Sequence, residues 1–121
     1  VTIIASGIMV AEALKAAAAL ANEDIDARDI NIFTWKPIDE EIIAAAANET
    51  GALVTCENHN IIGGLGSAVA EVLVSVCPKP LERVGINDEF GEVGTEAWLR
   101  EHFNLTAEAI AAAAKKAIAR K

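Results

Sequence analysis

The sequence predicts an α/β protein, a three-layer α/β/α sandwich built on a mostly parallel sheet. Short runs of β-branched and aliphatic residues alternate with longer, alanine-rich segments of helical periodicity, in the order β-α-β-α-β-α-β-α-α. Such alternation places helices on both faces of a parallel sheet, joined by right-handed crossovers. The chain has 121 residues, 53% of them hydrophobic, and no internal repeat or linker, so we expect residues 1–121 to form a single domain.

The first strand and helix occupy the first 21 residues. Val1–Ala5 is rich in β-branched residues, and Ser6-Gly7 marks a turn after it. From Ile8 to Ala21 the apolar residues recur at helical spacing. We expect one helix face to carry Val10, Leu14, Ala17 and Ala21, with Met9, Ala13 and Leu20 beside it. Glu12 and Lys15 are expected on the solvent side.

The second strand and helix lie between residues 27 and 51. Ala27–Thr34 alternates, with Ile30, Ile32 and Thr34 on one face and Asn31 and Phe33 on the other. Pro37 helps to stop this strand, and Asp39 is a good N-cap for a helix that runs to Thr50. Ile38 can pack onto Ile43 across the cap, and Gly51 supplies a C-terminal stop.

The second half of the chain continues the alternation. The expected elements are a strand at Ala52–Cys56, a helix at Ser67–Cys77, a strand at Leu81–Ile86, a short helix at Thr95–Phe103 and a last helix from Thr106 to Lys121. Leu105 precedes the Thr106 cap and can pack onto Ile110.

Bulk properties exclude several classes of protein. A formal charge of −8 and a pI near 4.7 argue against nucleic-acid binding, which needs a basic face. No apolar run approaches the roughly 20 residues that span a bilayer, and no signal peptide is present, so we expect a soluble, cytoplasmic protein without a membrane partner. Cys56 and Cys77 lack CxxC spacing, so we expect reduced thiols. The chain starts within a core strand and not at Met, so we expect a piece of a longer chain.

The segment from Glu57 to Ser67 combines a polar strand end with Gly63, Gly64 and Gly66. Ligands of open α/β sheets are met where a strand ends and a helix begins. The glycines do not form G-x-G-x-x-G, and they follow the third strand, whereas that fingerprint follows the first. A tight structural turn is the favoured interpretation. Close packing against a partner domain and anion binding at the helix N-terminus remain as alternatives.

Two titratable residues alternate at the end of that strand. Glu57 and His59 could point the same way and act as acid and base. Asn58 and Asn60 make ordinary turn hydrogen bonds an equally simple explanation, and a structural or interface role is favoured. His102 is expected on the surface of the short helix.

The loop Asn87–Gly94 carries three carboxylates, those of Asp88, Glu89 and Glu92. Carboxylates bind divalent cations, but the EF-hand spacing is absent, and a solvated turn anchored to the core by Phe90 is favoured. Trp35 is expected at an interface and Trp98 in the core, whereas Ser6 lacks the G-x-S-x-G context of a nucleophile.

Three segments carry a family resemblance. They are Thr34 to Ile43 (TWKPIDEEII), Val54 to Val72 (VTCENHNIIGGLGSAVAEV) and Arg83 to Gly94 (RVGINDEFGEVG). In this order the chain resembles the C-terminal domain of transketolases, especially the C-terminal section of split bacterial and archaeal transketolases. The C-terminal domain of 1-deoxyxylulose-5-phosphate synthases is similar. Relatives usually have an acidic residue at Asn58 and often Ser at Val93, which affects loop contacts rather than the fold.

The resemblance implies a transketolase C-terminal-domain-like fold in which the first and third strands are neighbours. Ser6-Gly7 and the Glu57–Ser67 segment would then flank one crevice. In this family thiamine diphosphate and Mg²⁺ are held by two preceding domains or a companion N-terminal subunit. Catalytic histidines and phosphate-binding arginines lie there too. The resemblance therefore implies no catalytic, cofactor-binding or metal-binding residue in this chain.

The leading hypothesis is an assembly domain, inactive alone, that organises the dimer of a transketolase. The complete enzyme, a transferase, would move a two-carbon ketol unit between sugar phosphates. The alternatives are a small-molecule or anion-binding regulatory module and the C-terminal domain of a deoxyxylulose-phosphate synthase. The candidate interface residues are Ser6, Gly7, Glu57, His59, Gly63, Gly64, Gly66, Asp88 and Phe90.

Overall fold

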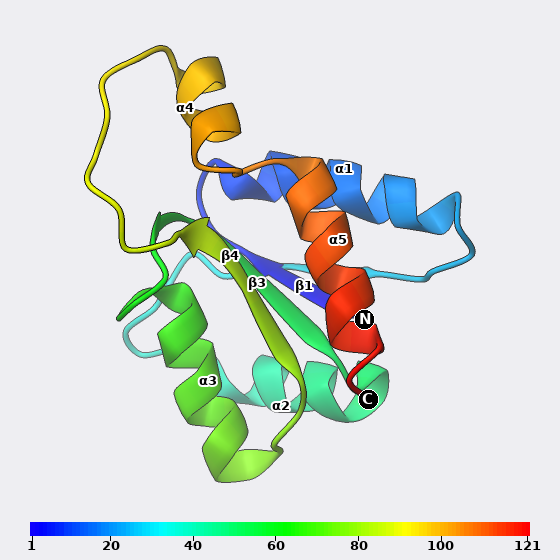
Figure 1. The fold of residues 1–121 in the computed structure, drawn as a ribbon. Coiled ribbons are helices and arrows are strands. Elements are labelled where there is room, and N and C mark those ends of the chain that lie inside the picture. Colours follow the sequence, from blue (N-terminus) through cyan, green and yellow to red (C-terminus); the bar gives the residue numbers. More distant parts are fainter.

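The computed structural model describes residues 1–121 as four strands and five helices (Figure 1). The elements are β1 (Thr2–Ala5), α1 (Met9–Ala21), β2 (Arg28–Asn31), α2 (Glu40–Thr50), β3 (Leu53–Asn60), α3 (Leu65–Val76), β4 (Leu81–Ile86), α4 (Glu96–His102) and α5 (Ala107–Ile118). All strand pairs are parallel, in the order β2-β1-β3-β4. The predicted α/β fold and the predicted element order are confirmed, and β1 and β3 are neighbours as the family resemblance implied.

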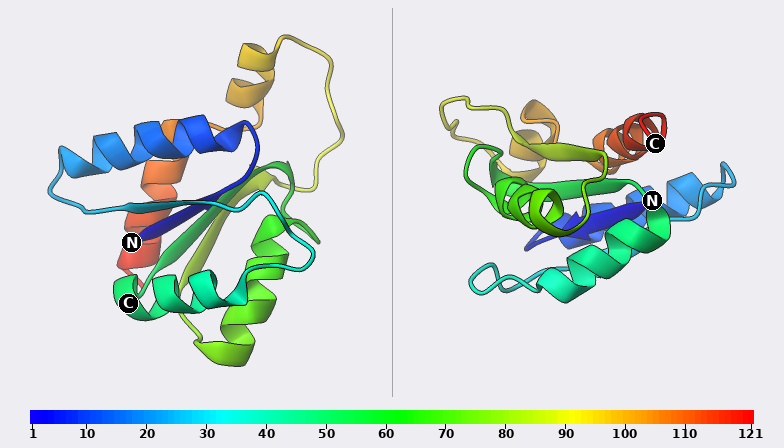
Figure 2. Two further views of the ribbon diagram at one scale, coloured as in Figure 1. Left: turned by 180° about the vertical axis from the view of Figure 1, so that it is seen from behind. Right: turned by 90° about the horizontal axis from the view of Figure 1, so that it is seen from below.

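The sheet lies between two pairs of helices, which gives three layers (Figures 1 and 2). α1 and α5 cover one face, and α2 and α3 cover the other. Because strand residues alternate between faces, Ile3 packs on the face covered by α1 and α5, and Ile4 packs on the face covered by α2 and α3. No helix of the molecule is both long enough and apolar enough to cross a membrane.

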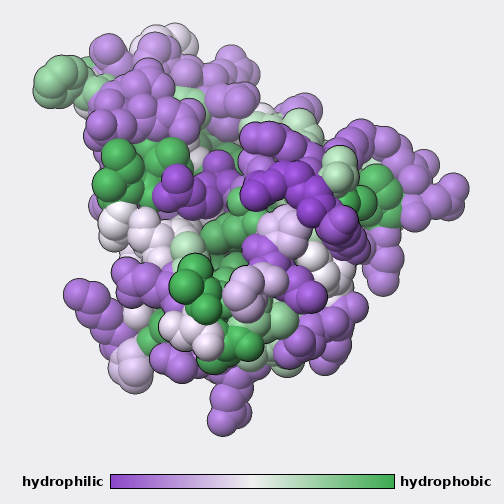
Figure 3. All heavy atoms as spheres, turned by 60° about the horizontal axis from the view of Figure 1, so that its bottom comes forward, coloured by the Kyte–Doolittle hydropathy of each residue, from purple (hydrophilic) through white to green (hydrophobic).

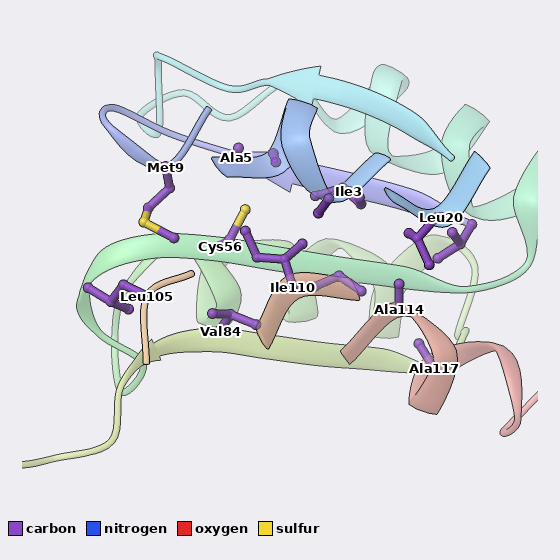
Figure 4. Packing of buried hydrophobic residues seen from close by; sticks show 14 of the residues in the cluster. Ile3, Ala5, Met9, Leu20, Cys56, Val84, Leu105, Ile110, Ala114 and Ala117 are labelled. Atoms are coloured by element: carbon purple, nitrogen blue, oxygen red, sulfur yellow. The ribbon is translucent and has the colours of Figure 1, made fainter. Parts of the chain in front are cut away.

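The core between the sheet and the pair α1 and α5 is aliphatic (Figure 4). Met9 and Leu20 of α1 are fully buried against the strands, as is Ile110 of α5. The small side chains of Ala114 and Ala117 allow α5 to approach the sheet closely. Leu105 and Ile110 both belong to this cluster, as expected for residues that flank the Thr106 cap.

The opposite core holds α2 and α3 against the sheet. Its centre includes Ile43 of α2 and Leu65 and Val69 of α3, all fully buried. The start of α2 follows the predicted pattern, since the Ile42 backbone N–H donates to the Asp39 carboxylate over 3.0 Å. Gly51 ends the helix in the left-handed region at φ +74°, as the sequence predicted.

The buried face of α1 is rotated about the helix axis relative to the predicted face. Met9, Ala13, Ala16 and Leu20 face the core together with Glu12, whereas Leu14 is 56% exposed. Glu12 was expected in solvent. Its burial is possible because three donors from α1, α4 and the start of α5 reach its carboxylate, a set of partners that helical periodicity cannot reveal.

Several element boundaries also differ from the prediction. β2 ends at Asn31 rather than at Thr34 because its only partner, β1, ends at the paired Ala5. β3 continues to Asn60 rather than stopping at Cys56, because β4 pairs with it up to Asn60 across an irregular register. The last helix ends at Ile118, three residues before the predicted end.

Candidate functional site

The first loop and the end of β3 meet at one edge of the sheet. The Ser6 backbone N–H donates to the Cys56 carbonyl over 3.3 Å. A Cβ placed on Gly7 would lie 3.6 Å from Oδ1 of Asn58. Ser6 and Gly7 therefore lie beside the polar end of β3, at the point where two neighbouring parallel strands lead to helices on opposite faces.

The carboxylate of Glu57 caps the N-terminus of α3. Its side chain is only 1% exposed. The Leu65 N–H donates to Oε2 over 2.6 Å, and the Gly66 N–H donates to Oε1 over 2.9 Å. A carboxylate at this place satisfies two free N–H groups and the positive end of the helix dipole. These two bonds also explain why α3 begins at Leu65, two residues before the predicted Ser67.

Glycines create the space that this carboxylate occupies. A Cβ on Gly64 would lie 2.0 Å from Oε2 of Glu57 and 2.7 Å from the Asn60 carbonyl oxygen. A Cβ on Gly85 of β4 would lie 3.2 Å from Cγ of Glu57 and 2.9 Å from the His59 carbonyl oxygen. Gly63 adopts φ +75°, the left-handed region that favours glycine. Gly85 was not among the predicted site residues, because only the pairing of β3 with β4 brings it next to Glu57.

Hydrogen bonds fix the rest of the turn. The Ile62 N–H donates to Oδ1 of Asn60 over 2.8 Å, and the Gly63 N–H donates to Oγ of Ser67 over 2.9 Å. The Arg83 guanidinium donates to the Ile61 carbonyl over 3.0 Å. Gly66 also packs closely, since an added Cβ would lie 2.8 Å from Oγ1 of Thr55. The segment is thus held by its own side chains and by β4.

The structure separates Glu57 from His59. Glu57 is buried under the start of α3, whereas His59 is exposed, and no hydrogen bond or ion pair joins them. Nδ1 of His59 lies 2.9 Å from its neighbour's carbonyl oxygen, that of Asn60. The ring faces Trp35 edge-on, with 6.4 Å between ring centroids. The two side chains consequently do not form an acid–base pair.

The loop Asn87–Gly94 has no regular structure and little contact with the core. Phe90 is 98% exposed, so the prediction that it anchors the loop is wrong. The side chain of Asp88 accepts a hydrogen bond from Nδ2 of Asn60 over 3.0 Å, which ties only the start of the loop to β3. No group of three His, Cys, Asp or Glu side chains anywhere in the chain is arranged to hold a metal ion.

Trp98 on α4 is 46% exposed, so its predicted place in the core is also wrong. Its ring stacks on His102, with 4.6 Å between centroids and 13° between planes. It also lies against Gly94, where an added Cβ would be 2.6 Å from Cε3 of the indole. Phe103, the residue after α4, enters the core instead. The side chain of Thr95 caps α4 by accepting from the Trp98 N–H.

Glu12 is a buried carboxylate with three hydrogen-bond partners, and the helical pattern of the sequence had placed it in solvent. Oε1 accepts from Lys15 over 2.8 Å and from Arg100 of α4 over 2.9 Å, and Oε2 accepts from the Ala107 N–H at the start of α5 over 3.1 Å. The hydrogen bond from Lys15 does most to lower the pKa of Glu12, with smaller contributions from Ala107 and Arg100, while burial acts in the opposite direction. These contacts join three helices, so the arrangement is structural.

The two cysteines are free thiols. Cys56 is fully buried, and this burial, with the nearby Asp29 and Glu57 carboxylates, raises its pKa to about 12. Such a thiol is a poor nucleophile. Cys77 is partly exposed and lies 3.1 Å from Oδ1 of Asn48.

Comparisons with known proteins agree on one family. The family model described as "Transketolase, C-terminal domain" matches residues 1–110. The chain is 55% identical, over its whole length, to the 6-deoxy-6-sulfo-D-fructose transketolase subunit SqwH of Clostridium sp. strain MSTE9 and covers 38% of that protein. It is 48% identical over 91% of its length to a putative transketolase C-terminal section of Methanocaldococcus jannaschii, of which it covers 34%.

Two further matches widen the comparison. The 1-deoxy-D-xylulose-5-phosphate synthase of Heliobacterium modesticaldum is 42% identical over 96% of the chain, which covers 18% of that enzyme. A solved structure, described as a split gene transketolase in an inactive beta4 tetramer, superimposes with a TM-score of 0.95 at 51% identity. That match covers 99% of this chain and 39% of the other. The chain therefore spans well under half the length of each of these relatives.

Proposed function

Since this chain belongs to the transketolase C-terminal domain family, we propose that residues 1–121 form the C-terminal assembly domain of a thiamine-diphosphate-dependent transketolase. The domain is one part of a longer protein, and it is inactive alone. The complete enzyme is cytoplasmic, is a homodimer where the preceding domains lie on the same chain, and transfers a two-carbon ketol unit from a ketose to an aldose. Preceding domains or a companion N-terminal subunit supply the catalytic residues.

The internal capping of α3 by Glu57 carries this proposal. The loop with an acid, a histidine and three glycines is the part of the chain most similar to an active site. Its acid is 1% exposed and is bonded to the Leu65 and Gly66 N–H groups, so it has no access to a substrate. A loop that is complete without a ligand is suited to holding a fixed surface against another domain.

The residues of this chain do not fit thiamine diphosphate and Mg²⁺. A diphosphate site needs free N–H groups or cations, and the N–H groups at the start of α3 are already occupied by Glu57. A Mg²⁺ site needs converging oxygen ligands, and no cluster of three acidic, histidine or cysteine side chains is present. We therefore assign the cofactor to other domains.

The substrate is not fixed by this domain. The relative from Clostridium is named for a sulfonated sugar, whereas an apulose-4-phosphate transketolase subunit of Phocaeicola vulgatus is 40% identical over 90% of the chain. Similar C-terminal domains thus serve enzymes named for different sugars. We propose a sugar with a terminal anionic group, phosphate or sulfonate, as the substrate class.

The 42% identity to a deoxyxylulose-phosphate synthase supports one alternative. In that case the role of this domain is the same, and only the reaction of the complete enzyme changes. A regulatory module that binds anions at the start of α3 finds less support, because Glu57 already occupies that position.

The test is a pair of calorimetric titrations of thiamine diphosphate in the presence of Mg²⁺. We expect no binding to residues 1–121, once circular dichroism has verified that this fragment is folded. We expect saturable binding to the complete enzyme, which is the full-length chain together with whichever preceding domains or companion subunit carry the magnesium- and diphosphate-binding motif G-D-G…N. Tight, magnesium-dependent binding to the fragment would contradict the proposal. A ketol-transfer assay on the assembly tests the reaction itself.

A further inference from the structure

α4 and the loop before it contribute almost nothing to the core. No residue of α4 is buried, whereas α1, α2, α3 and α5 each bury at least three. Every residue from 87 to 98 is exposed. Figure 1 shows the loop leaving the end of β4 and α4 standing away from the sheet. We name residues 87–102 the α4 arm, and the rest of the chain the body.

The helices on the opposite side of the sheet differ from α4. α2 and α3 pack against the strands through fully buried side chains such as Ile43 and Val69. Figure 3, turned to bring this side forward, shows mainly hydrophilic groups with small apolar patches. These helices therefore have one face in the core and one in solvent. From α4 only Leu99 reaches the core, and it is only partly buried.

Contacts near its two ends attach the arm to the body. At the start, Nδ2 of Asn60 donates to Oδ1 of Asp88 over 3.0 Å. Near the end, Nη1 of Arg100 donates over 2.9 Å to Oε1 of Glu12 on α1. Leu99 lies beside this ion pair in the sequence and packs against the core. The ten residues between Asp88 and Leu99 are all exposed, so the arm is held by its ends.

The backbone reverses direction at both ends of the arm. Asp88 and Asn104 adopt φ of +55° and +57°, and Asp24 is the one further residue other than glycine with a positive φ. Asp and Asn adopt this left-handed conformation more readily than most residues with a side chain. Phe103, directly before Asn104, is 8% exposed and fixes the chain in the core. The arm is therefore bounded by two turns, and the second one is anchored.

The ion pair between Glu12 and Arg100 is the main polar contact between α4 and the body. The two side chains are 9% and 29% exposed, so solvent screens this pair less than a pair on the open surface. Arg100 is the only lysine or arginine of the arm, and its guanidinium also pairs with Glu96 one turn earlier. Without Arg100, no cation links α4 to α1.

α4 can leave without breaking the core beneath it. A hollow of about 340 Å³ lies between α4 and the start of α5, with Ala97 on one side and Thr106 on the other, so the two helices are not closely packed. If the arm moves away, Glu12 retains Lys15 and the Ala107 N–H as partners. The junction of α1 with α5 therefore does not depend on the arm.

We propose that the α4 arm opens as a unit while the body stays folded, and that the Glu12–Arg100 ion pair is the latch that holds it closed. Opening breaks the latch and withdraws Leu99 from the core. It also unwinds α4, because a helix of seven residues is not stable alone in water. Phe103 and the turn at Asn104 remain in place as the fixed end.

The experiment is native-state hydrogen exchange of the full-length chain, read by mass spectrometry at several urea concentrations below the unfolding transition. The reporters are amides of α4, among them that of Leu99, which donates to the Thr95 carbonyl over 2.9 Å. Amides of α1 and α3 report on the body. Arg100→Met removes the latch, and Arg100→Lys keeps its charge. Lys116→Met is the matched control, because Lys116 pairs with Glu82 in the body.

In the wild type we expect α4 amides to exchange at least about a hundredfold faster than the slowest amides of α1 and α3. Their rates should depend little on urea, because opening the arm exposes little surface. Arg100→Met should speed their exchange by about tenfold, since it removes hydrogen bonds to charged groups, and Arg100→Lys should recover part of this loss. Lys116→Met should leave them unchanged, because its contact with Glu82 is the same whether the arm is open or closed.

Three results would overturn the proposal. If α4 amides exchange at the rate and with the urea dependence of those in α1 and α3, the arm opens only when the whole domain unfolds. If α4 exchanges fast but Arg100→Met changes nothing, the Glu12–Arg100 pair is not the latch. If Lys116→Met accelerates α4 as much as Arg100→Met does, the effect is one of overall stability. The wild-type comparison needs no variant, and circular dichroism verifies that each variant is folded.

Discussion

Two segments at the same edge of the sheet look alike in sequence and differ completely in structure. The segment Glu57–Gly66 comprises the end of β3 and the turn into α3, and the loop Asn87–Gly94 follows β4. Both contain acidic residues and glycines. In the first, the acid is buried and doubly bonded at the start of α3. In the second, all residues are exposed and the acids have no cationic partner.

The distance along the chain to the next helix accounts for the difference. α3 begins five residues after β3 ends, so the Glu57 side chain reaches the free N–H groups of its first turn. α4 begins ten residues after β4 ends, and Thr95 rather than an acid caps it. The same residue types therefore form a closed turn in the first segment and an exposed loop in the second. Gly64 and Gly91 represent the two cases, because Gly64 leaves room for the Glu57 carboxylate whereas Gly91 has no neighbouring atom near its Cα hydrogen positions.

Valine substitutions at two glycines should show the largest contrast. Gly64→Val brings a Cβ to 2.0 Å from Glu57 Oε2 and 2.7 Å from a backbone oxygen, so we expect a loss of about 3 kcal/mol in unfolding free energy. Gly91 has no atom within 4 Å of an added Cβ, and Gly91→Val should change stability by less than about 0.5 kcal/mol. Urea denaturation measures both. Equal effects would remove the distinction between the two segments.

The acids of the two segments should differ next. Glu57→Ala leaves the Leu65 and Gly66 N–H groups without an acceptor inside the protein, and we expect it to cost about 2 kcal/mol. Glu92→Ala, at an exposed and unpaired acid, should be neutral to within about 0.5 kcal/mol. Hydrogen exchange of the Leu65 and Gly66 amides provides an independent measurement, since their protection should drop in Glu57→Ala and stay unchanged in Glu92→Ala.

Glu12 sharpens the comparison because it holds the far end of the open loop through Arg100 of α4. Glu12→Gln should cost about 1 kcal/mol at neutral pH, since it weakens the bonds to Lys15, Arg100 and Ala107. The pKa of Glu12 is lowered from its ordinary value of 4.5 by these donors, Lys15 first, so its contribution is complete above that value. The contribution is lost as pH falls through the lower pKa of the folded state.

The measurement is the difference in unfolding free energy between the wild type and Glu12→Gln over a series of pH values. We expect this difference to shrink as the solution is acidified below 4.5. Glu71→Gln, at an exposed and unpaired residue, serves as the control and should show no such change. A difference that stays constant with pH would mean that the Glu12 carboxylate does not stabilise the junction of α1, α4 and α5.

The fold could be predicted from the sequence because local patterns determine most of it. The alternation of strands and helices, the Asp39 and Thr106 caps and the stop at Gly51 depend on near neighbours, and each is present in the structure. The error on α1 arose from contacts distant in sequence. Glu12 is buried because of Arg100 and Ala107, which are 88 and 95 residues away.

The site was harder to predict for the same reason. The glycines around Glu57 could be recognised as a tight turn, but the group that they accommodate could not be identified from spacing alone. Gly85 belongs to the same arrangement and lies on the neighbouring strand. Phe90 and Trp98 were assigned to the core because they are large and apolar, but Phe90 is 98% exposed and Trp98 is 46% exposed, because large apolar residues are not always buried.

The smallest effect is expected at His59, which tests whether the closed segment has any chemical role. His59→Ala removes an exposed ring whose contacts are its neighbour's carbonyl and an edge-on Trp35, so stability should change by less than about 0.5 kcal/mol. Ketol transfer by the assembled enzyme should remain within about twofold of the wild type, because the imidazole does not meet the buried Glu57 carboxylate. Sedimentation velocity, run in parallel, reports whether assembly is intact. Loss of turnover with normal assembly would show that His59 acts on the substrate and that the carboxyl end of β3 belongs to the active site.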